Sequence, residues 1–185
     1  MPHPNILDSR QTALIVVDIQ EGFRNAIPDF AVVASRASMA VRGFQILGIP
    51  VIVTEQYPKG LGPTAEEIHF TLPDGFEAIE KTAFSSCGAE AFVARLEEAE
   101  IKQVVLCGLE THICVNQTAH DLLSRDFQVH ILTDCVCSRF EHDKVAGLAK
   151  MQSSGVISSS IEMALFELMS DARHEKFKEI QNLIK

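Results

Sequence analysis

The 185-residue sequence carries 16 basic and 25 acidic side chains, which gives a formal net charge of −9. A chain of this length can bury a sizeable core as one domain, and its acidic balance argues against a groove for nucleic acid. No apolar run is long enough to span a bilayer, and residues 1–12 lack the apolar core of a secretory signal. Together with five cysteines, an odd number, these features lead us to expect reduced thiols, a cytoplasmic location, and neither a membrane nor a nucleic acid as partner.

Short apolar runs alternate with amphipathic stretches along the chain. The apolar runs predict buried strands at 13–17, 50–54, 76–80, 103–107, 128–133 and 155–157. The amphipathic stretches predict helices at 30–47, 64–67, 89–99, 114–125, 142–152, 160–169 and 172–184, the second of them opened by a capping box. This alternation is typical of an α/β fold, and we expect a single domain over residues 1–185 with helices on both faces of a parallel sheet.

The stretch from Gly108 to His120 joins a predicted buried strand to a predicted helix, with Cys114 at the junction. A thiol at the start of a helix lies in the positive end of the helix dipole, which favours the thiolate. We therefore interpret Cys114 as a nucleophile. On position alone, it could equally be a small buried residue in the first turn of a helix, because free cysteine is among the most buried residue types.

Other chemically active residues follow different strands on the side of the predicted sheet where Cys114 lies. Asp18 follows the first strand, the loop 55–63 the second, Lys81 the third and Asp134 the fifth. In open α/β sheets the carboxyl ends of the strands form the ligand crevice. Asp18 could accept the thiol proton there, while Lys81 holds the carboxylate ionised. The plainer interpretations are a turn-forming Asp18 and a solvated Lys81.

Further polar and aromatic side chains near these positions are candidates for contacts with a substrate. Gln20 could orient Asp18 or bind substrate, and His112 is a second candidate base. The predicted substrate-binding residues are Gln20, Phe23, Gln56, Tyr57, Glu110, Thr111 and His112. The cysteines expected to pack in the interior are Cys87, Cys107, Cys135 and Cys137.

Three motifs contain the proposed reactive residues. Asp18 lies in Val-Val-Asp-Ile-Gln, Lys81 in Glu-Lys-Thr-Ala-Phe-Ser, and Cys114 in Gly-Leu-Glu-Thr-His-Ile-Cys-Val. In order and spacing they resemble the motifs of the isochorismatase-like cysteine hydrolases. The segments 54–62 and 177–181 resemble the isochorismatase-domain-containing protein branch of that family. The resemblance covers nearly the whole chain.

The resemblance implies a six-stranded parallel sheet in a three-layer α/β/α sandwich, which is a Rossmann-like arrangement. It implies a catalytic triad of Asp18, Lys81 and Cys114. It also implies a non-proline cis peptide bond at Glu110–Thr111, which would aim backbone N–H groups, including that of Cys114, at an oxyanion. A homo-oligomer is implied as well, and the sequence adds one hint, the apolar residues of the C-terminal helices. These residues are Phe166, Leu168, Phe177 and Leu183.

The chain also departs from parts of the family. Nicotinamidase members carry an Asp-x-His metal pair after the second strand, where this chain has Glu55-Gln56-Tyr57. We therefore expect no metal and no cofactor. True isochorismatases usually have a glycine at the nucleophile position, so Cys114 indicates covalent thiol chemistry in place of vinyl-ether cleavage.

The combined prediction is a hydrolase that cleaves a C–N bond, of the amide type, in a small molecule. Asp18 takes the proton of Cys114, the thiolate attacks the carbonyl carbon, and the backbone N–H groups of Thr111 and Cys114 stabilise the oxyanion. Two alternatives stay open: a non-catalytic small-ligand-binding or scaffold protein on the same fold, and a redox sensor in which Cys87 or Cys107 resolves an oxidised thiol.

Overall fold

The computed structural model describes residues 3–185. Six strands form one parallel sheet in the order β3-β2-β1-β4-β5-β6. The strands are β1 (Thr12–Val17), β2 (Val51–Gln56), β3 (Ile79–Lys81), β4 (Gln103–Gly108), β5 (Gln128–Val136) and β6 (Ile157–Ser159). The order reverses direction between β1 and β4, and the crevice at such a switch point is the usual ligand site of open α/β sheets.

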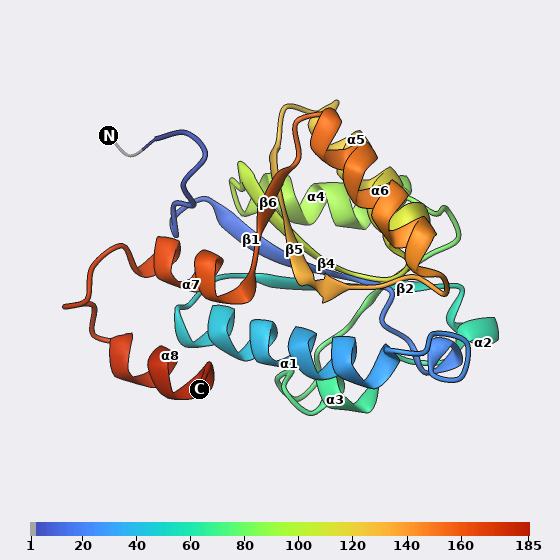
Figure 1. Cartoon of the computed structure of the whole chain (residues 1–185), viewed down its shortest axis with the longest axis horizontal. Coiled ribbons are helices and arrows are strands. Elements are labelled where there is room, and N and C mark those ends of the chain that lie inside the picture. Colours follow the sequence, from blue (N-terminus) through green and yellow to red (C-terminus); the bar gives the residue numbers. More distant parts are fainter. Residues whose placement is uncertain (1–2) are drawn as a thin grey trace.

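Helices cover both faces of the sheet (Figure 1). One layer holds α1 (Phe30–Ile46), α3 (Glu66–His69), α7 (Ile161–Met169) and α8 (Phe177–Leu183). The other holds α4 (Glu90–Glu98), α5 (Asn116–Leu123) and α6 (Glu141–Ser153), and the short α2 (Pro58–Leu61) lies beyond the carboxyl end of β2. The predicted three-layer α/β/α sandwich is confirmed.

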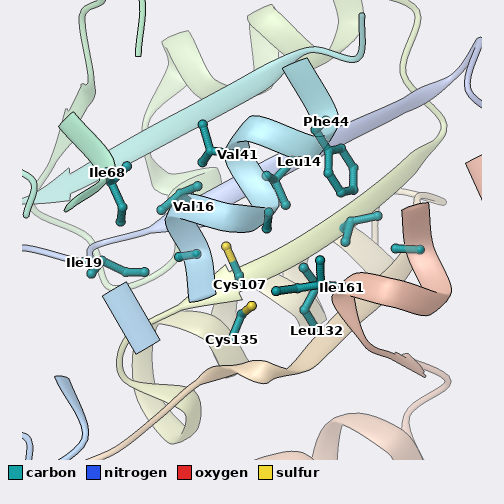
Figure 2. Packing of buried hydrophobic residues seen from close by; sticks show 14 of the residues in the cluster. Leu14, Val16, Ile19, Val41, Phe44, Ile68, Cys107, Leu132, Cys135 and Ile161 are labelled. Atoms are coloured by element: carbon teal, nitrogen blue, oxygen red, sulfur yellow. The ribbon is translucent and has the colours of Figure 1, made fainter. Parts of the chain in front are cut away.

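The central strands are apolar because helices bury them on both sides. All six residues of β1 are buried, and successive side chains point to opposite faces. Leu14 and Val16 pack in the apolar layer beneath α1, whereas Ile15 and Val17 pack beneath α4 and α5. Figure 2 shows the first of these layers, with Phe44 of α1 above the strands.

The five cysteines are all unpaired thiols. Cys107 and Cys135 lie inside the apolar layer beneath α1, as Figure 2 shows, and Cys114 belongs to the layer on the other face of the sheet. Cys107 is therefore not available as a resolving partner for Cys114, and that form of the redox hypothesis is wrong. Cys87 was expected to pack in the interior, but it is only half-buried.

The segment around residues 55–67 differs from its prediction. Part of the Gly- and Pro-rich loop forms α2, and α3 begins without a capping box. The Thr64 hydroxyl instead donates to Glu55 Oε1 at 2.6 Å, and the Glu67 carboxylate pairs with Arg24 at 2.8 Å. The Thr64 hydroxyl and the Glu67 carboxylate, which would form the capping box, thus bind residues elsewhere in the chain.

Asp134 does not lie at the sheet edge where it was expected. The strand β5 continues to Val136, which places Asp134 within the strand. Its carboxylate pairs with Arg36 of α1 and accepts the backbone N–H of Ile161 at the start of α7. Asp134 therefore joins the sheet to two helices and takes no part in the crevice.

The C-terminal helices pack against their own chain. Ile180 of α8 is fully buried in the layer beneath α1, and Phe166 of α7 meets Phe177 edge-on, with ring centroids 6.0 Å apart. Because the apolar residues of the C-terminal helices have partners within the chain, they no longer indicate a second subunit. A homo-oligomer stays a prediction from the resemblance. Within residues 3–185 no helix is long and apolar enough to cross a membrane.

Candidate active site

Asp18, Lys81 and Cys114 come together at the carboxyl ends of the strands. Asp18 directly follows β1 in the left-handed region (φ 52°), which short polar side chains such as Asp adopt more readily than most. Its backbone N–H donates to Thr54 of the neighbouring β2 at 3.2 Å. The strand pairing thus continues up to the residue whose carboxylate enters the site.

Asp18 and Lys81 form a buried ion pair. Lys81 Nζ lies 2.6 Å from Asp18 Oδ2, and the two side chains are 1% and 0% exposed. The ammonium also donates to Gln56 Oε1 at 2.9 Å and to the backbone carbonyl of Phe84 at 2.9 Å. The Thr54 hydroxyl donates to Asp18 Oδ1 at 2.7 Å. Burying two charges is costly unless they are paired and hydrogen-bonded, and here both conditions are met.

Cys114 lies in a π-helical turn, η3 (Thr111–Val115), between β4 and α5. Only 6% of the residue is exposed, and it lines a cavity of about 350 Å3. Burial, and then the negative charge of Asp18, raise the pKa of the Cys114 thiol to about 12, although Lys81 opposes the shift. Burial therefore outweighs the helix dipole, which by itself would favour the thiolate. Cys114 is a thiol that needs a base.

Two glycines allow the turn to take its place. Gly108 ends β4 at φ 136°, and a Cβ there would lie 2.1 Å from the carbonyl oxygen of Val17. Gly147 lets α6 approach the turn, since a Cβ there would lie 2.9 Å from the Cα of His112. Both contacts are with backbone atoms, so the position of the turn depends on the absence of these side chains.

The hydrogen bonds of the turn correct the predicted oxyanion hole. The Thr111 N–H donates to the carbonyl of Cys137 at 2.9 Å and is not free for an oxyanion. The N–H groups of Ile113 and Val115 donate to the carbonyl of Glu110, and within residues 3–185 no acceptor outside the turn takes the N–H of Cys114. The cis peptide bond is Leu109–Glu110, one residue before the expected place.

The cavity beside Cys114 has a mainly apolar wall. The residues that line it are Gly22, Phe23, Ala26, Gln56, Leu61, Phe84, Glu110, Ile113, Cys114 and Arg139. Of the predicted substrate-binding residues, the structure brings Phe23, Gln56 and Glu110 to this wall. Their contact with a substrate stays a prediction.

Two other predicted residues have structural roles. The Gln20 side chain is fully buried, and its amide nitrogen donates to the carbonyls of Gln56 and Gly62, while its amide oxygen accepts the N–H of Gln56. Gln20 therefore holds the 56–62 loop and does not face the cavity. The Thr111 hydroxyl donates to Cys137 O at 2.9 Å and is buried with it.

Tyr57 and His112 also lie away from the cavity. Tyr57 is 55% exposed and borders a separate hollow, together with Pro58 and Lys59. His112 Nδ1 is hydrogen-bonded to Ser138 Oγ at 3.0 Å, and its Nε2 lies 3.8 Å from an oxygen of Asp143 on α6. The turn directs this imidazole toward α6, so His112 is not placed to act as the base for Cys114.

Sequence reasoning missed Arg139, Phe84 and Thr54. Arg139 lines the cavity and binds Glu110, which lies 29 residues earlier, and no local spacing indicates such a pair. A signal did exist for Phe84, because it lies in the Lys81 motif and its carbonyl binds the Lys81 ammonium. Thr54 ends the predicted second strand at the register of Val17, next to Asp18, which is the hint that could have found it.

The residues at the place of the nicotinamidase metal pair have other partners. Glu55 Oε1 accepts the backbone N–H of Thr64 at 2.7 Å and its hydroxyl at 2.6 Å. Gln56 donates to the Thr82 carbonyl and accepts from Lys81. Glu55 therefore holds the loop, and Gln56 binds the buried lysine.

Comparison with known proteins identifies the family of the chain. The family model for the isochorismatase domain matches residues 12–163. Isochorismatase domain-containing protein 1 of Salmo salar is 45% identical over 94% of this chain, which spans only 61% of that protein. Isochorismatase domain-containing protein 2 of Danio rerio is 40% identical over 96% of the chain and 89% of its own length. The solved structure of a MAR1 ribonuclease from Caenorhabditis elegans superposes with a TM-score of 0.92 at 36% identity, over 97% of this chain and 92% of the other. The chain belongs to the isochorismatase domain family.

Proposed function

We propose that this protein hydrolyses the C–N bond of a small amide through a covalent thioester on Cys114. The observation that carries the proposal is the meeting of a buried thiol, which lines a cavity, with a carboxylate that a buried ammonium holds in place. Membership of a hydrolase family supports the reaction type. The C–N bond and the roles of the three residues are our inference from the chemistry of the site.

In the first step the proton of Cys114 moves to Asp18 as Sγ attacks the carbonyl carbon. The raised pKa of the thiol makes a separate ionisation unfavourable, so proton transfer accompanies bond formation. Lys81 remains charged and stabilises the carboxylate before the transfer. General-base assistance of this kind contributes roughly 10²- to 10⁴-fold in rate.

The later steps reuse the same groups. The N–H of Cys114 stabilises the oxyanion of the tetrahedral intermediate, and one such donor is worth about 10²- to 10³-fold. Asp18, now protonated, gives its proton to the leaving nitrogen as the C–N bond breaks, which leaves a thioester on Cys114 and a free amine. Asp18 then takes a proton from water, whose oxygen attacks the thioester, and the carboxylic acid leaves as the thiol is restored.

The cavity limits the substrate to a small molecule. Its volume of about 350 Å3 is near the lower end of ligand pockets, and Phe23, Leu61 and Phe84 give it an apolar surface. The mechanism also needs Cys114 reduced, which fits the cytoplasmic setting predicted from the sequence.

The name of the Caenorhabditis elegans neighbour raises cleavage of RNA as a second candidate function. RNA binding normally relies on a basic surface, because the phosphate backbone dominates affinity. This chain carries a net charge of −9, and of the cations at its site Lys81 is buried while Arg139 is paired with Glu110. The site therefore favours a small neutral substrate.

A panel of small amides tests the proposal. We expect the parent protein to release amine from at least one of them, and we expect Cys114→Ala and Asp18→Asn each to abolish that release while the far-UV circular dichroism stays unchanged. A single-stranded oligoribonucleotide is included as a further substrate. Turnover of amides that survives in Cys114→Ala would overturn the covalent mechanism. Cleavage of the oligoribonucleotide, lost in the same variant, would favour the second candidate, and silence on every substrate would favour the binding or scaffold alternative.

A further inference from the structure

Glu110 is a buried carboxylate in the cavity wall that the proposed mechanism does not use. Its side chain is 7% exposed, and it shares the wall with Cys114. The backbone N–H of Arg139 and its Nε both donate to the same oxygen, Glu110 Oε1, at 3.2 and 3.0 Å. Two donors on one oxygen fix the orientation of the carboxylate and leave the other oxygen unused.

The second oxygen, Glu110 Oε2, is open to the cavity. It accepts no hydrogen bond from any residue in the range 3–185. The buried side-chain atoms of that range that lack a partner are Asn116 Oδ1 and His130 Nε2, so Glu110 Oε2 is not sealed from solvent. Since the residue as a whole is only 5% exposed and lines the cavity, the cavity is where this oxygen is reached.

Few other acceptors in the wall are left for a ligand. Phe23, Ala26, Leu61, Phe84 and Ile113 contribute apolar surface. The side-chain amide of Gln56, the remaining neutral polar group of the wall, is engaged on both its oxygen and its nitrogen. A charged oxygen beside this apolar surface gives a strong and directional preference for a hydrogen-bond donor.

We propose that Glu110 is a specificity-determining residue, whose Oε2 accepts an N–H of the scissile amide and so selects substrates with an N–H on the leaving side. This inference rests on the proposed function and narrows its substrate class to primary and N-monosubstituted amides. Esters, which have no such N–H, leave the charged oxygen without a partner.

The charge of Glu110 is also felt by the nucleophile. Glu110 is one of the groups that raise the pKa of the Cys114 thiol, after burial and Asp18. Replacing it with a neutral residue therefore lowers that pKa. The pH dependence of Cys114 alkylation in such a variant therefore checks that Glu110 lies close to the thiol, apart from its role toward substrate.

The variant Glu110→Gln tests the inference with little change in shape. The amide oxygen of glutamine can keep both bonds from Arg139, which turns its NH₂ group toward the cavity and sets a donor against the N–H of an amide substrate. The probes are phenylacetamide and methyl phenylacetate, which share one acyl group. The matched control is Glu80→Gln, which removes a carboxylate from an exposed residue on β3 outside the cavity wall.

We expect Glu110→Gln to lower kcat/KM for phenylacetamide by about 10- to 100-fold, the range for a hydrogen bond to a charged group, and to change the ester value by less than about threefold. Glu80→Gln should leave both values near those of the parent protein. An equal fall for amide and ester in Glu110→Gln, or no change in either, would overturn the inference.

Binding separates this inference from the proposed function. If the parent protein cleaves neither compound, the proposed function fails for this acyl group, and titrations of Cys114→Ala followed by NMR decide the role of Glu110. Tighter binding of phenylacetamide than of the ester, lost when Glu110→Gln is added, would support that role without any catalysis. Equal binding of the two compounds would end it.

Discussion

Two carboxylate–cation pairs lie close to Cys114 and differ in how completely they are enclosed. In the Asp18–Lys81 pair both side chains are almost fully buried, and each charged group has further hydrogen bonds inside the protein. In the Glu110–Arg139 pair the guanidinium side chain is 48% exposed, and one carboxylate oxygen is unbonded. The closed pair is suited to holding a base in one geometry, and the open pair is suited to meeting a ligand.

The largest expected difference between the pairs is in stability. Lys81→Met leaves the Asp18 carboxylate buried without its counter-ion, and removing one partner of a buried pair costs about 3–5 kcal/mol. We expect this loss in the free energy of unfolding measured with urea, together with a fall in activity of roughly 10²- to 10⁴-fold. A variant as stable as the parent protein would mean that the pair does not support the fold.

A further buried group, His130, makes the stability of the protein depend on pH. Burial lowers the pKa of His130 to about 4, below its ordinary value of 6.5. Between these values the unfolded chain binds the extra proton, so stability is full above pH 6.5 and falls as the pH drops. We expect a loss of about 2 kcal/mol between pH 7 and pH 5. The variant His130→Leu should remove most of that loss in paired urea titrations, and an unchanged loss would assign it to other groups.

The closed pair also sets the reactivity of the thiol. Asp18 raises the pKa of Cys114 and Lys81 lowers it, so Asp18→Asn should shift that pKa downward. We expect alkylation of Cys114 by iodoacetamide at pH 8, located by peptide mass spectrometry, to become roughly threefold faster for each pKa unit of the shift, because the thiolate fraction rises tenfold while the nucleophilicity of the thiolate falls. Slower alkylation in Asp18→Asn would contradict the placement of the carboxylate beside the thiol. The half-buried Cys87, whose pKa is raised to about 11, serves as the internal reference.

The open pair should matter least for stability. Arg139 is half exposed while the Glu110 side chain is 7% exposed, so the pair lies between the exposed class, worth about 0–1 kcal/mol, and the buried class, and Arg139→Met should lower the free energy of unfolding by less than Lys81→Met does. Its effect should be seen in selectivity, because Glu110 then loses one of the two donors that orient it. The ratio of kcat/KM for phenylacetamide to that for its methyl ester is the readout. If Arg139→Met lost as much unfolding free energy as Lys81→Met, the proposed difference between the two pairs would be wrong.

The sequence predicted most of the elements that carry the site, for physical reasons. The strand β1 and the helix α1 were found nearly to the residue, because burial on both faces and on one face leave clear apolar patterns. Asp18, Lys81 and Cys114 follow strands, so the rule for parallel sheets was enough to bring them to one edge.

The rest depended on contacts between distant segments, which local patterns do not record. Thr64 was interpreted as a helix cap, but its hydroxyl binds Glu55 across the loop. The position of Cys114 in the chain indicates only the helix dipole, which favours the thiolate, whereas burial in the fold raises the pKa of its thiol. Arg139 carries no sequence signal at all, because its importance comes only from the carboxylate of Glu110 that it holds.

The most direct test of the account is a search for the acyl group on Cys114 itself. The parent protein is mixed with the amide of the panel that it cleaves fastest, quenched in acid within the first turnover, and its intact mass is measured. The account predicts a mass increase equal to that of the acyl group, located on the peptide that contains Cys114 and absent from Asp18→Asn. Release of amine during that turnover without any adduct on Cys114 would contradict it.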